Sequence, residues 1–133
     1  MSERLSASLR GLQDPVVVAA FSGWNDAGNA ASAAIEHLGE AYQAELVVEL
    51  DPDDFYDYQV NRPETSITED GDRVITWPTT RIKVAQLAGG RDVILVDGIE
   101  PNLRWRQFCA LLTSALHSAE PSQVILLGAL LAD

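Results

Sequence analysis

Apolar runs without polar alternation are the first feature of this chain, and they predict strands that are buried on both faces. Residues 16–21 read VVVAAF, and such a run is typical of a central strand in a parallel sheet. Further apolar segments predict strands over residues 44–50, 91–96 and 123–131. The last of these is as apolar as the first, so its composition predicts a central position in the sheet as well.

Two segments have the spacing of helices instead. Residues 30–38 carry an apolar face, with Gly39 as the expected end of the helix. A second helix is predicted from Asn102, a suitable N-cap, to residue 119, just before Pro121. Three leucines at near-helical spacing predict a short surface helix within residues 1–14, which we interpret as an N-terminal extension.

A hairpin is predicted within residues 65–77, because an Asp-Gly pair separates two segments that contain Thr, Ile and Val. Residues 82–87 alternate between apolar and polar, as in a strand with one solvated face. Together these elements predict an α/β fold with a mainly parallel central sheet plus an antiparallel hairpin. Residues 15–133 are expected to form a single α/β domain.

The composition argues against several classes of partner. The chain has 133 residues, 47% of them hydrophobic, which is enough for one modest core. Its net charge of -11 argues against nucleic acid and membrane surfaces, because both attract clusters of Lys and Arg. Cys109 is the one cysteine, so an internal disulfide is impossible and no cysteine-based zinc site is expected. With no signal sequence or long apolar span in the pattern, we expect a cytoplasmic protein.

Two loops that follow buried strands are the predicted place of function. Residues 22–26 and 97–105 leave the carboxyl ends of their strands, where open α/β sheets bind ligands. Each loop carries a carboxylate, Asp26 or Glu100, and such a pair can divide the roles of general acid and base. The alternatives are structural: Asp26 can cap a helix, and Glu100 can anchor Arg104 or the start of the next helix.

Other polar and aromatic side chains complete this candidate pocket. Arg62 stands alone in an acidic segment, where it forms a structural ion pair or binds a substrate carboxylate. The remaining members of the candidate pocket are Trp24, Asn25, Tyr56, Asp57, Asn102 and Arg104. The chain lacks the glycine pattern of a phosphate-binding loop, and its acidic residues lack the spacing of a calcium-binding loop. We therefore expect no cofactor and no metal ion.

Four motifs, in order along the chain, resemble the proteasome assembly chaperone family in its actinobacterial branch. They are GWNDAG, FYDYQVNRP, WP and GIEPNLRWRQF, and the final LLGALLAD is similar to the same family. The resemblance implies a three-layer α/β/α sandwich of the phosphorylase and hydrolase type, and it transfers no catalytic residue. It also implies that residues 15–133 are the front part of a longer family domain.

The apolar last strand leaves two explanations open: it pairs with another copy, or the chain continues in a longer protein. The leading hypothesis is a chaperone-like protein-interaction domain, without enzymatic activity, that binds a protein partner or self-associates as a homo-oligomer. The alternative is a small-molecule-binding protein, or a hydrolase-like or phosphorylase-like enzyme. That alternative uses the loops after Phe21 and Val96 as its pocket.

Overall fold

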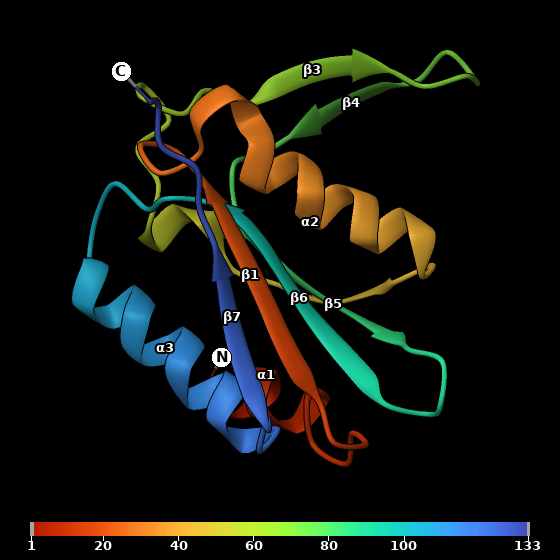
Figure 1. The fold of residues 1–133 in the computed structure, drawn as a ribbon. Coiled ribbons are helices and arrows are strands. Elements are labelled where there is room, and N and C mark those ends of the chain that lie inside the picture. Colours follow the sequence, from red (N-terminus) through yellow and green to blue (C-terminus); the bar gives the residue numbers. More distant parts are fainter. Residues whose placement is uncertain (1, 133) are drawn as a thin grey trace.

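The computed structural model describes residues 2–132, which contain three helices, seven strands and two short 3-10 turns (Figure 1). The elements are α1 (Ser2–Ser8), β1 (Val16–Ser22), α2 (Ala30–Ala41), β2 (Glu45–Glu49), β3 (Glu64–Ile67), β4 (Arg73–Thr76), β5 (Thr80–Gln86), β6 (Asp92–Ile99), α3 (Trp105–Ser118) and β7 (Gln123–Leu127).

Five strands form the main sheet, in the order β2-β5-β6-β1-β7. β1 runs parallel to β6 and β7, whereas β5 runs antiparallel to both β6 and β2. The prediction of a mainly parallel sheet is therefore wrong, and the sheet is mixed. The reason is the short connection at residues 87–91, which joins β5 directly to β6, whereas a parallel pair needs a long crossover.

β7 lies at the edge of the sheet, and not at its centre as its composition predicted. It pairs with β1 only through residues 123–127. Beyond it, the chain turns to the loop after β1, where the Ala27 N–H donates to the Ala129 carbonyl at 3.0 Å. The side chain of Leu126 is 74% exposed. The apolar composition of β7 thus predicted that both its faces are buried, but within residues 2–132 no element covers Leu126.

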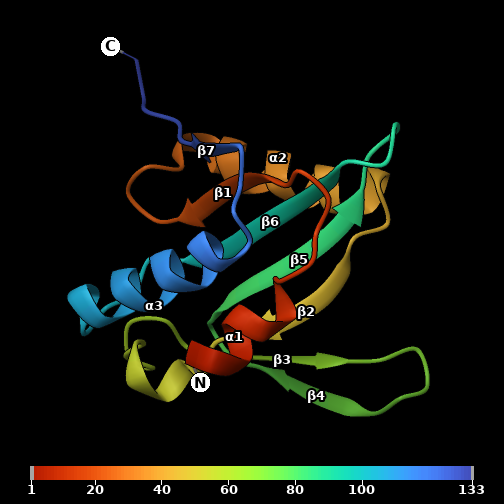
Figure 2. The same cartoon turned by 90° about the horizontal axis from the view of Figure 1, so that it is seen from below.

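Helices cover both faces of the main sheet (Figures 1 and 2). On one face, α2 packs through Ala31 and Ile35 against alternate residues of β1 and β6. On the other face, α1 and α3 share a core that contains Leu5, Leu9 and Phe108. Because Leu5 and Leu9 are fully buried, α1 belongs to the core and is not a surface helix.

Two helix boundaries differ from the sequence prediction. α2 continues through Gly39 to Ala41, because a glycine in a helix is only weakly unfavourable and the sheet supports this helix. α3 begins at Trp105, since the Asn102 side chain is used elsewhere, as an acceptor for the Asp57 N–H at 2.8 Å.

β3 and β4 form a separate two-stranded sheet that projects from the body of the molecule (Figures 1 and 2). We call residues 64–76 the arm. The predicted hairpin is confirmed, and Gly71 at its tip has a φ of +87°, which favours glycine. The register pairs Thr65 with Ile75 and Ile67 with Arg73, so both isoleucines lie on one face of the arm.

Candidate functional site

The loops after β1 and β6 leave the main sheet at the same end, the carboxyl end of both strands, which we call the rim. Ser22 is the register partner of Ile99, and the Glu100 N–H donates to the Ser22 carbonyl at 2.9 Å. Gly23 has a φ of +149°, which favours glycine, and an added Cβ would lie 2.7 Å from the Glu100 Cδ, so the Glu100 side chain packs closely over this glycine. The two loops therefore meet, as their places after parallel strands predict.

Asp26 acts as a helix cap in this structure. Its Oδ1 accepts the backbone N–H groups of Ala31 at 2.8 Å and Ser32 at 3.0 Å, and its Oδ2 accepts the Ser32 hydroxyl at 2.6 Å. The carboxylate is buried, with 6% of the residue exposed. The Ser32 hydroxyl lowers the pKa of Asp26, burial opposes the shift, and the two backbone N–H groups lower the pKa further.

Tyr56, Asp57 and Asn102 form a polar network that holds the loop after β2 to the loop after β6. The Tyr56 hydroxyl donates to the Ile99 carbonyl at 2.7 Å and lies 2.8 Å from the Thr80 hydroxyl. Asn102 Oδ1 accepts the Asp57 N–H. Burial raises the pKa of the Tyr56 hydroxyl. These side chains fix two loops at the rim, where they support a site without lining it.

Three other predicted residues, Trp24, Asn25 and Arg104, are exposed at the rim, and Asn25 lines the groove that also contains Glu100. Trp24 is 86% exposed at the tip of the loop after β1. The Asn25 carbonyl accepts the Ala129 N–H at 2.9 Å, which ties this loop to the segment after β7. Arg104 forms an exposed ion pair with Asp54, with 3.4 Å between Nη1 and Oδ1.

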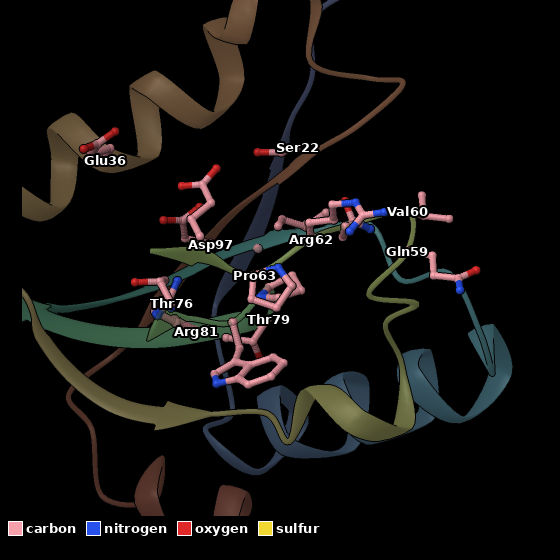
Figure 3. A pocket seen from close by; sticks show the side chains of 16 residues that line it. Ser22, Glu36, Gln59, Val60, Arg62, Pro63, Thr76, Thr79, Arg81 and Asp97 are labelled. Atoms are coloured by element: carbon pink, nitrogen blue, oxygen red, sulfur yellow. The ribbon is translucent and has the colours of Figure 1, made fainter. Parts of the chain in front are cut away.

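A polar pocket of about 840 Å³ opens at the rim, on the same side of the sheet as α2 (Figure 3). We call it the rim pocket. Strand ends, the loop at residues 59–63 and the base of the arm surround it. Its lining is Ser22, Glu36, Gln59, Val60, Asn61, Arg62, Pro63, Glu64, Thr76, Trp77, Pro78, Thr79, Arg81, Asp97, Gly98 and Ile99. Of the nine residues predicted for the candidate pocket, Arg62 is the one in this lining.

Asp97 is a candidate site residue that the sequence prediction missed. It lies half-buried near the end of β6, directly opposite Arg81 on β5. Burial raises the pKa of the Asp97 carboxyl, against the opposing effects of Lys83 and Arg81. The signal was present in the sequence, because Asp97 is the first polar residue after an apolar strand.

Glu100 lies on the other side of the sheet from Asp97. It contributes to an apolar groove of about 410 Å³ between α3 and β7, together with Trp105, Phe108 and Leu126. The structure therefore brings the loops of Asp26 and Glu100 to one rim but gives their side chains different surroundings. Asp26 caps α2, whereas Glu100 lies beside Gly23 and the groove.

Residues 2–132 contain no group of three or more His, Cys, Asp or Glu side chains placed to hold a metal ion. Among these residues there is also no helix with the length and apolar character to cross a membrane.

Comparison with solved structures finds closely similar folds. A PAC2 family protein from Streptomyces avermitilis is 51% identical, with a TM-score of 0.84 over 90% of this chain and 51% of that chain. A proteasome-assembly chaperone homologue from Mycobacterium tuberculosis is 49% identical, with a TM-score of 0.81 over 89% of this chain and 50% of that one. This chain thus spans about half the length of these relatives.

A more distant M. tuberculosis protein of unknown function is 29% identical, with a TM-score of 0.74 over 87% of this chain and 40% of that chain. Comparison with the curated proteins found no match. The model of the PAC2 family matches residues 20–133. These findings confirm the resemblance that the four motifs indicated, and the chain belongs to the PAC2 family.

Proposed function

We propose that this chain is a protein-interaction domain of the chaperone type, which acts in the cytoplasm as a homo-oligomer. The observation that carries the proposal is the exposure of two apolar side chains on the arm, since Ile67 is 70% exposed and Ile75 is 57% exposed. Family membership supports it, since one relative is described as a proteasome-assembly chaperone homologue. A protein partner is therefore the expected ligand.

The arm has the properties of a binding element. A two-stranded hairpin that stands alone is only marginally stable in water, and a third strand or a packed face is needed for a stable sheet. β3 and β4 have free outer edges, and such edges pair readily with strands of other chains. A partner that adds strands to the arm would also place its own side chains beside the two isoleucines.

The partner that we propose for the arm is a second copy of this chain. A two-fold axis beside an edge strand pairs that strand with its own copy, and two-fold contacts are the commonest in homo-oligomers. Two arms would then form one four-stranded sheet. Ile67 and Ile75 of both copies would share its apolar face.

We further propose that residues 15–133 are the front part of a longer family domain. The support is that the relatives from Streptomyces and Mycobacterium are about twice as long. The rest of the domain would pair with β7, cover Leu126 and complete a three-layer α/β/α sandwich of the phosphorylase and hydrolase type. A crystal structure of a chain that includes the relatives' second half tests this, and an uncovered β7 edge in it would refute the proposal.

Substitution on the arm tests the proposed function. We expect the wild-type chain to associate with rising concentration, and Ile67→Lys and Ile75→Lys each to weaken association by about tenfold or more. The reason is that a lysine would bring a charge into the apolar contact between the isoleucines of the two copies. Size-exclusion chromatography with light scattering measures the mass, and thermal unfolding checks that these exposed changes leave the monomer stable.

Two variants serve as controls. Ser66→Lys adds the same charge on the opposite face of the arm and should leave association unchanged. Leu126→Lys alters β7, which is the rival surface. A monomeric wild-type chain, or dissociation by Leu126→Lys but not by the arm variants, would exclude the arm as the interface.

A further inference from the structure

The rim pocket has the position and size of a ligand site. Its volume of about 840 Å³ lies within the range of about 300–1,000 Å³ that is usual for small-molecule sites. Ser22 and Asp97 come from the carboxyl-terminal parts of two parallel strands, where α/β sheets bind ligands. Trp77 and Pro63 supply apolar surface on the side of the arm.

Opposite charges lie on different sides of this pocket. In Figure 3, Asp97 and Glu36 are on one side and Arg62 is on the other. Within residues 2–132, neither Asp97 nor Arg62 has a side-chain hydrogen bond or an ion pair. Asp97 is half-buried, and the nearby Arg81 and Lys83 make neither a hydrogen bond nor an ion pair with it, so its carboxyl group is only partly compensated. Both groups are therefore available to a ligand.

The second arginine of the pocket is already neutralised. Arg81 Nε lies 2.6 Å from Glu49 Oε1 on the neighbouring strand. Glu64 adds a further carboxylate to the lining, so the acidic groups outnumber the free cations. This balance disfavours a phosphate or another simple anion. It favours a ligand that carries an ammonium group.

We propose that the rim pocket binds a short peptide with free termini. Asp97 and Glu36 hold its ammonium group, and Arg62 binds its carboxylate through charge-assisted hydrogen bonds. The peptide backbone lies between them, beside the indole of Trp77. This binding site is additional to the protein-interaction function and does not depend on the arm being an interface.

Binding of triglycine by the purified chain tests the proposal, with isothermal titration calorimetry as the measurement. We expect one triglycine per chain, with a Kd of about 1 mM or below. Arg62→Gln should weaken triglycine by about fivefold or more, yet leave triglycinamide unaffected, because the amide lacks the carboxylate that Arg62 binds. Asp97→Asn should weaken triglycine similarly, yet leave N-acetyltriglycine unaffected, because the acetyl group removes the ammonium charge.

Matched variants control for the general change in charge. Arg106→Gln and Asp72→Asn alter exposed charges outside the pocket lining and should leave triglycine binding unchanged. Thermal unfolding of each variant confirms that it is folded. The proposal is overturned if triglycine at about 10 mM gives no heat beyond dilution. It is equally overturned if N-acetyltriglycine binds as well as triglycine, since the site would then take an anion alone.

Discussion

Asp26→Ala is expected to lower the free energy of unfolding by about 2–3 kcal/mol. The substitution removes the acceptor for two backbone N–H groups at the start of α2 and for the Ser32 hydroxyl. Loss of a helix cap costs about 0.5–2 kcal/mol, and unpaired donors in a buried position add to this cost. Urea denaturation of the wild-type and variant chains measures the difference.

The Asp26→Asn variant shows how much of this stabilisation depends on charge. The pKa of Asp26 in the folded chain lies below its ordinary value of 3.8, so its charged form stabilises the fold. That contribution is complete above pH values near 3.8 and is lost as the pH falls through the lower folded pKa. The stability difference between wild type and Asp26→Asn should therefore shrink in strong acid. A difference that stays constant with pH would contradict the charged cap.

Gly98→Ala is expected to destabilise the chain by about 3 kcal/mol, because it inserts a methyl group where β6 and β5 already touch. A Cβ at this position would lie 2.8 Å from the Thr80 Cβ and 2.9 Å from the Thr80 Cα, in addition to a contact with the Thr80 hydroxyl. The Thr80 Cα and Cβ do not move when the Thr80 side chain rotates, so a change of rotamer cannot relieve the clash. The same strand pair positions Asp97 and Arg81 at the rim.

Gly39→Ala is the matched control for this prediction. Gly39 lies within α2, and the nearest atom to an added Cβ, Leu95 Cδ1, is 3.9 Å away. This variant should be more stable than wild type by about 0.5–1 kcal/mol, because the helix propensity of alanine is higher than that of glycine. If Gly98→Ala unfolds at the same urea concentration as wild type, the close strand contact is refuted.

The pattern of the sequence predicted the order of elements and the meeting of two loops, because both depend on local signals. Val16 to Phe21 form a buried strand, the Asp-Gly pair forms a hairpin, and the loops at Ser22 and Glu100 share a rim. The direction of a strand depends on the length of the connection before it, and its position in the sheet depends on the strands with which it pairs. Apolar composition alone could not show that β5 is antiparallel or that β7 lies at an edge.

The candidate site was predicted less completely than the fold, because each polar residue has structural and functional explanations that sequence cannot separate. Asp26 has the helix-capping role that was one of its two explanations. Asp97 was overlooked because its strand reads as core, although the alternation of side chains turns it to the α2 face beside the pocket. Its surroundings come from residues far apart in the chain, such as Glu36 and Arg62.

Hydrogen exchange of the arm tests the proposed interaction most directly. If two arms pair, the backbone amides of β3 and β4 should exchange more slowly as protein concentration rises over roughly a 100-fold range, because association stabilises the paired state. The Ile75→Lys variant should lose this concentration dependence while the amides of β1 and β6 stay protected. Exchange in the arm that is equally fast at every concentration would contradict the account.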